Sequence, residues 1–146
     1  MEHVVLRVIT KLFIAPIILF ALYVQFHGDY GPGGGFQAGV ILAVAFILYA
    51  LVFGLEATQR AVPVWVVKTG AALGVLIYAG VGVATMLLGG KYLDYEMLAP
   101  NSTHHAGQHY GILLVELGVG VAVSSTMLYV FYAFAGREPE IDDSDW

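Results

Sequence analysis

Residues 28–39 read GDYGPGGGFQAG, and this glycine-rich stretch interrupts a chain that is otherwise strongly apolar. Pro32 fixes its own backbone angle φ and has no N–H group to donate. Gly33, Gly34 and Gly35 can adopt backbone angles that are closed to other residues. We therefore expect a sharp turn here that leads directly into a helix.

The residues after the glycines exclude a nucleotide-binding loop. Such a loop needs a Lys to reach the phosphates and a Ser or Thr to hold magnesium. Here Gly35 is followed by Phe36, Gln37 and Ala38, which supply neither group. We expect Phe36 and Gln37 to be the first residues of an apolar helix, with Gly39 one turn further on.

Composition indicates an integral membrane protein. Hydrophobic residues make up 59% of the 146 residues and charged residues 12%, against roughly 45–50% and about 25% in soluble domains. A membrane-spanning helix needs about 20 apolar residues, and four stretches satisfy this requirement. They are residues 8–26, 36–55, 69–88 and 110–135. The predicted fold is all-α, an integral membrane bundle of four transmembrane helices that together form one domain, residues 1–135.

Basic residues predict the orientation of the spans, because Lys and Arg near span ends favour the cytoplasmic side. If the chain crosses four times, Lys91 lies at one end and the remaining basic residues lie at the end that carries the amino terminus. Those residues are Arg7, Lys11, Arg60, Lys68 and Arg137. We therefore expect both termini in the cytoplasm, with residues 136–146 as an acidic cytoplasmic tail.

Ionisable residues inside spans are costly and are therefore functional candidates. Glu116 is the only acid within the four predicted spans. It could form a structural hydrogen bond to a neighbouring helix, belong to a proton or sodium path shared with another subunit, or lie exposed at the interface. Lys68 starts the third span at the opposite end, so we expect no pairing between Lys68 and Glu116. The chain has no cysteine, and we predict neither a metal site nor a cofactor.

The PGGGF motif of residues 32–36, with Gly39 after it and His27 before it, resembles the signature of the MnhB/MrpB family, which are small membrane subunits of the Mrp-type multisubunit cation/proton antiporters. Proteins of that family are short and have four spans, so the resemblance covers essentially the whole chain. One departure is that four residues separate His27 from Pro32, more than in many relatives.

The resemblance implies a transporter subunit rather than an enzyme. It would act in a hetero-oligomeric complex that exchanges Na⁺ for H⁺ in a bacterial or archaeal cell membrane. Its partners would be the other antiporter subunits and the lipid bilayer, with no nucleic acid. The chain would be required for assembly and would be a candidate to line part of the ion path, for which Glu116, Lys68 and His27 are the candidate residues.

Two other functions remain open from the sequence. The same module occurs in the membrane arm of related energy-converting hydrogenase complexes. A small channel or carrier that works alone is the second alternative, although such a carrier would be expected to bury several polar groups near the midplane. Glu116 is the main group of this kind here, together with Ser124, Ser125 and Thr126.

Overall fold

A computed structural model describes residues 4–28, 33–99 and 106–137. Its elements are α1 (Val4–His27), α2 (Gly35–Phe53), α3 (Leu55–Ala61), α4 (Val64–Leu87), the short 3₁₀ helix η1 (Tyr95–Leu98) and α5 (Ala106–Ala135). Helices α1, α2, α4 and α5 are long and apolar enough to cross a membrane. The structure therefore confirms the all-α fold and the four predicted candidate spans.

The helix ends differ from the predicted spans by a few residues. Helix α4 begins at Val64, directly after Pro63, and therefore includes Lys68 in its second turn. Helix α2 ends at Phe53 because Gly54 has a φ of 96°, a backbone conformation that favours glycine. The segment expected to be a plain connection then forms α3. Pro32 and residues 138–146 of the predicted acidic tail lie outside the described residues, and the division into domain and tail stays a prediction.

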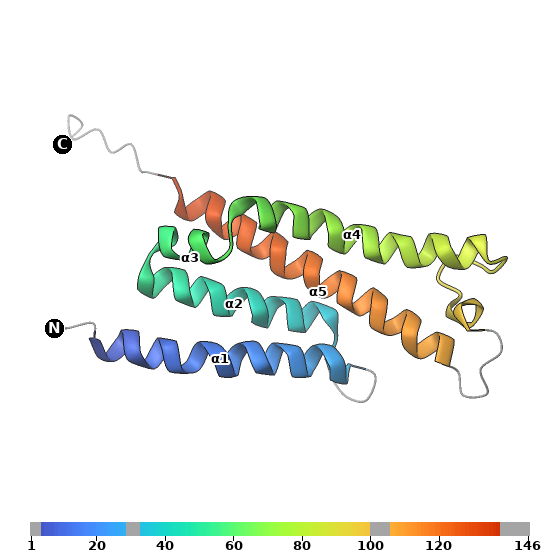
Figure 1. Cartoon of the computed structure of the whole chain (residues 1–146), viewed down its shortest axis with the longest axis horizontal. Coiled ribbons are helices and arrows are strands. Elements are labelled where there is room, and N and C mark those ends of the chain that lie inside the picture. Colours follow the sequence, from blue (N-terminus) through green and yellow to red (C-terminus); the bar gives the residue numbers. More distant parts are fainter. Residues whose placement is uncertain (1–3, 29–32, 100–105, 138–146) are drawn as a thin grey trace.

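The four long helices lie side by side in one layer (Figure 1). Helix α1 packs against α2, α2 packs against α5, and α5 packs against α4. The last helix in the sequence therefore lies between α2 and α4. The described ends of the chain, at α1 and after α5, lie at the same end of the layer (Figure 1).

Small residues bring α2 and α4 close to α5. A Cβ added at Gly39 of α2 would lie 2.7 Å from the carbonyl oxygen of Gly120, and one added at Gly74 of α4 would lie 2.6 Å from that of Gly118. Real Cβ atoms do not approach oxygen so closely, so both helices depend on glycine here. Gly70 similarly faces Ser125. Gly39, Gly70 and Gly74 thus lie at the contacts with α5.

The end of the layer that carries the termini is held by a small core. Val67, Leu128 and Tyr132 are buried together there. The Tyr132 hydroxyl donates a hydrogen bond to the Val62 carbonyl oxygen at 3.0 Å. Because Val62 lies between α3 and α4, this bond connects the end of α5 to the segment that starts α4.

At the opposite end, the segment between α4 and α5 folds back over both helices. The Tyr92 ring lies against Gly82 of α4, and the Tyr95 ring lies against Gly111 of α5. The Thr85 hydroxyl is 3.1 Å from the Lys91 carbonyl oxygen and can donate to it. These contacts keep α4 and α5 together beyond the point where α1 and α2 end.

Candidate functional site

Glu116 lies beside the turn that joins α1 to α2. A Cβ added at Gly28 would lie 2.6 Å from Glu116 Oε2, and one added at Gly34 would lie 3.1 Å from Oε1. The carboxylate therefore lies close to the backbone at Gly28 and at Gly34, two positions within the glycine-rich stretch. The structure brings together two features that are far apart in the sequence.

The three consecutive glycines are needed for three different reasons. Gly33 has a φ of 153°, which other residues rarely adopt. Gly34 has an extended backbone with a φ of 172°, so its constraint is the nearby carboxylate of Glu116. Gly35 lies against the Glu116 backbone itself, because a Cβ there would be 2.7 Å from the Glu116 carbonyl carbon. Of the three glycines, Gly33 is thus the one that requires a positive φ.

The carboxylate of Glu116 is placed near the positive end of α2. The Ala38 amide donates to the Gly34 carbonyl oxygen at 3.0 Å, which is the first helical bond of α2. The amides of residues 35–37 precede that bond and point toward the start of the helix. A helix N-terminus carries a partial positive charge that favours a nearby anion. A carboxylate here can hold the turn, and it can also bind a proton or a cation.

Glu116 is half-buried and lies ten residues after the start of α5 at Ala106. Ten helical residues correspond to about 15 Å along the axis. Because Glu116 is level with Gly35, it lies where α1 ends and α2 begins rather than at the middle of the layer. The first stretch of α5, from Ala106 to Glu116, extends past this level (Figure 1).

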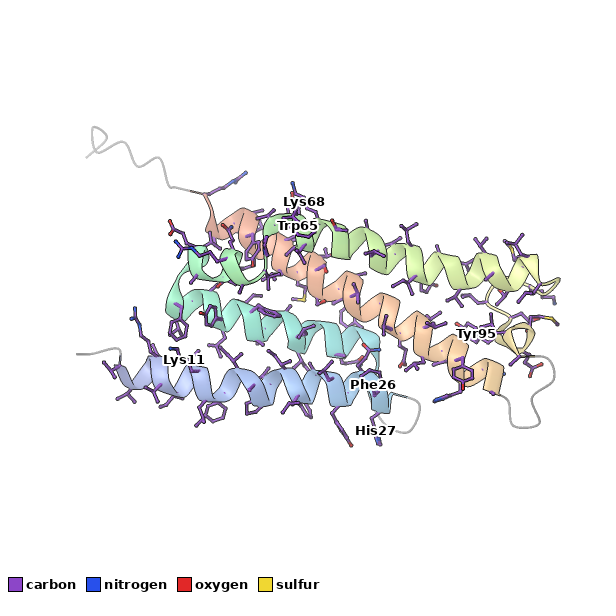
Figure 2. The ribbon with its side chains drawn as sticks, viewed as in Figure 1. Lys11, Phe26, His27, Trp65, Lys68 and Tyr95 are labelled. Atoms are coloured by element: carbon purple, nitrogen blue, oxygen red, sulfur yellow. The ribbon has the colours of Figure 1, made fainter. Side chains whose placement is uncertain are left out.

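His27 is next to Gly28 in the sequence, but its side chain points away from α2 (Figure 2). His27 is exposed, and its ring stacks on the Tyr23 ring, with 4.9 Å between the ring centroids. The structure therefore places the imidazole on the side of α1 that faces away from α2.

Lys68 lies near the start of α4 (Figure 2). Its side chain is exposed, and its Nζ is 5.5 Å from the centroid of the Tyr129 ring of α5. Glu116 and Tyr129 are thirteen residues apart on α5, which corresponds to about 20 Å. The structure thus agrees with the expectation that Lys68 does not pair with Glu116.

Gln25 is a residue that the sequence reasoning did not single out. It is buried on α1, and its amide oxygen lies against Gly120 of α5. A glutamine inside an otherwise apolar span was the available signal, because polar side chains in spans usually face other helices. Gln25 is thus on the side of α1 that faces α5, one turn of α5 away from Glu116.

The fold and this site define an all-α protein with four candidate membrane spans and one carboxylate held at a backbone turn. Residues 5–129 match the domain described as related to the MnhB subunit of Na⁺/H⁺ antiporter. The chain belongs to this MnhB family of antiporter subunits, which are parts of transporters rather than enzymes.

Individual relatives agree with the family. The chain is 32% identical over 139 residues to the "Putative antiporter subunit mnhB2" of Staphylococcus aureus strain Newman, a match that covers 92% of this chain and 96% of the relative. Proteins of the same name from strains JH1 and COL match equally well. The similarity therefore extends over nearly the whole length of both chains.

Proposed function

We propose that this chain is a subunit of a multisubunit Na⁺/H⁺ antiporter and that the complex requires it for assembly. Its partners are the other antiporter subunits, Na⁺ and H⁺ are the ions that the complex exchanges, and its location is a bacterial or archaeal cell membrane. Both termini face the cytoplasm in this proposal. The family match and the names of the relatives support the antiporter over the hydrogenase membrane arm.

The observation that carries the assembly role is the single layer of helices. A single layer leaves both of its faces available to other subunits and to lipid. Large apolar side chains are accordingly exposed on every span, for example Leu19 on α1, Leu51 on α2, Leu76 on α4 and Phe134 on α5. Extended apolar surface of this kind marks contacts with protein or membrane.

The same arrangement argues against a carrier that works alone. Glu116 is the only carboxylate in the four spans. Lys68 lies in the second turn of α4, about 20 Å from Glu116 along α5, and the side chain of His27 points away from α2. A self-contained exchanger would need polar groups that converge near the midplane, whereas Glu116 lies where α1 ends and α2 begins.

The position of Glu116 supports a structural role in holding the turn before α2. By lying against Gly28 and Gly34, its carboxylate supports the direction in which α2 leaves the turn. Its half-buried position at the outer side also supports a second candidate role, in which Glu116 lines the outer part of an ion path completed by another subunit. Of the three sequence candidates for an ion path, Glu116 is the one that the geometry favours.

Deletion of the chain tests the proposal. The complete set of antiporter genes would be expressed with and without this gene in a host that lacks its own Na⁺/H⁺ antiporters. We expect the deletion to remove the full-size complex from native gels and to abolish Na⁺-dependent recovery of a pH dye in membrane vesicles. A full-size complex that persists without this chain would contradict the assembly role.

A further inference from the structure

We propose that a phospholipid acyl chain binds in a groove on one face of the helix layer, with its ester carbonyl accepting a hydrogen bond from Gln25. The site lies outside the proposed assembly and ion-path roles, and it is built by α1, α2, α5 and the start of α4.

The groove consists of two adjoining cavities. One, of about 140 Å³, lies between α1, α2 and α5 and is lined by Gln25. The other, of about 200 Å³, lies between α2, α5 and the segment from Val62 into α4. Both are lined by Leu42, Val121 and Ser124, so they adjoin along the same stretch of α2 and α5, and the proposed site takes them together as one groove.

The length of this groove suits one acyl chain. Its lining on α5 runs from Leu117 to Leu128, which is about 17 Å along the helix. The hydrocarbon core of a bilayer is roughly 30 Å thick, so the acyl chains of one leaflet reach about 15 Å deep. A chain that enters at the Gln25 end can therefore fill the groove along its whole length.

Gln25 is the reason to expect a polar atom at one end of the bound molecule. The residue is 8% exposed, and its Nε2 has no hydrogen-bond partner within the part of the chain that the structure describes. A buried amide without a partner is unfavourable. Because the two ends of a Gln amide exchange places by a half-turn of the last bond, Gln25 can present its donor to an occupant of the groove.

The occupant must therefore be apolar along its length and must carry one acceptor at the Gln25 end. Apart from Gln25, the polar side chains that line the groove are Ser124 and Ser125. The Ser124 hydroxyl already donates to the Val121 carbonyl oxygen at 3.2 Å. Gln25 lies two residues before the end of α1, which is the level of the headgroup region, where lipid ester carbonyls lie. An acyl ester meets each of these requirements.

A photolabelling experiment tests the site in the assembled complex. The complex, with a tag on this chain, would be reconstituted in vesicles of phosphatidylethanolamine and phosphatidylglycerol that contain a phospholipid with a diazirine in the middle of one acyl chain. After irradiation, mass spectrometry would locate the label. We expect it to be at least fivefold enriched on the groove segments around Leu42 and Val121 over the exposed face of α4 around Leu76.

Two variants and a control make the test specific. Val121→Phe fills the shared part of the groove and should lower labelling there several-fold, whereas Leu76→Phe, on an exposed residue of α4, should leave it unchanged. Gln25→Leu keeps the size of the side chain but removes the donor, and should spread the label along α5. Recovery of the other subunits shows that each variant has assembled.

Three results would overturn the proposal: equal labelling of groove and α4 face, unchanged labelling in both groove variants, or a groove without label in an intact complex. The last result would mean that a helix of another subunit covers the groove. If Val121→Phe prevents assembly, Gln25→Leu alone decides the question.

Discussion

The backbone of Gly35 lies directly against the backbone of Glu116, with no room for a side-chain atom between α2 and α5. This contact joins the start of α2 to an inner helix of the layer. Because it involves the main chains of both residues, neither can move aside without displacing its helix. The direction of α2 thus depends on the absence of a Cβ at one position.

Gly35→Ala is accordingly expected to disrupt assembly. A Cβ at residue 35 would overlap the Glu116 carbonyl group, so α2 and α5 would have to separate. The matched control is Gly80→Ala, because a Cβ at Gly80 of α4 meets nothing within 4 Å and alanine is the better helix former. Pull-down of partner subunits by a tagged chain measures both variants. Equal recovery of partners would show that the close contact is not required.

Gly33→Ala and Gly34→Ala should differ in severity. Alanine at 33 would have to adopt a φ of 153°, a strained conformation that costs of order 1–3 kcal/mol. Alanine at 34 would approach Glu116 Oε1 most closely, at 3.1 Å, and the end of a flexible side chain can shift. We expect Gly34→Ala to retain more complex and more exchange. If Gly34→Val leaves the complex intact but abolishes exchange, the turn itself takes part in ion movement.

Glu116→Gln separates the two roles considered for this residue. Glutamine occupies the same space beside Gly28 and Gly34 but carries no charge. If the role is structural, Glu116→Gln should give normal recovery of the complex and an exchange rate above about half of the wild-type rate. Glu116→Leu should then lose both the complex and the exchange activity. Dye recovery in vesicles and native gels give the two readouts. Loss of exchange in an intact Glu116→Gln complex would instead establish the ion-path role.

Removing the Tyr132 hydroxyl should weaken the end of the layer that carries the termini. Tyr132→Phe keeps the buried ring but loses the hydrogen bond to the Val62 carbonyl oxygen. The expected loss is about 0.5–1.5 kcal/mol, with a further cost because that carbonyl is left without its donor. Tyr129→Phe is the control, because it keeps the ring that Lys68 contacts. Thermal denaturation of the detergent-solubilised complex should show a lower midpoint for Tyr132→Phe alone.

The orientation of the chain can be tested with single cysteines, since the protein has none of its own. Ser102 and Ser144 lie outside the described residues, but they belong to opposite ends in the four-span topology. We expect a membrane-impermeant maleimide to label Ser102→Cys in intact cells and Ser144→Cys only after permeabilisation. Labelling of both positions in intact cells would contradict the proposal that both termini face the cytoplasm.

Hydropathy was sufficient to predict four helices, because an apolar stretch of this length has few possible structures other than a membrane-spanning helix. It was less accurate at the start of α4. The predicted span begins after Lys68, whereas the helix begins at Val64. A lysine can nevertheless lie within a span when its long side chain reaches the interface, and the Lys68 side chain lies over the Tyr129 ring. Helix α3 was missed although Gly54 and Pro63 mark its two ends.

The order of the helices could not be predicted in the same way. Spans that are apolar on all sides give no periodic signal for the neighbour that each face meets. Glycines such as Gly39, Gly74 and Gly118 allow close helix contacts, but their presence in the sequence does not show that α5 lies between α2 and α4. The contact between Glu116 and the glycine turn depends on that order, as does the groove beside Gln25. Both features therefore required the structure.

The extension of α5 past the ends of α1 and α2 has a consequence for the surrounding bilayer. Helix α5 has 30 residues and α2 has 19, or about 45 Å and about 29 Å. Helix α2 matches the hydrocarbon thickness of an ordinary bilayer, which is roughly 30 Å, while α5 is longer than the same membrane is thick. Such hydrophobic mismatch is relieved by tilt, by local thickening of the bilayer or by a protein neighbour. The end of α5 that extends past α1 and α2 thus gains from contact with another subunit, whereas α2 fits the bilayer without one.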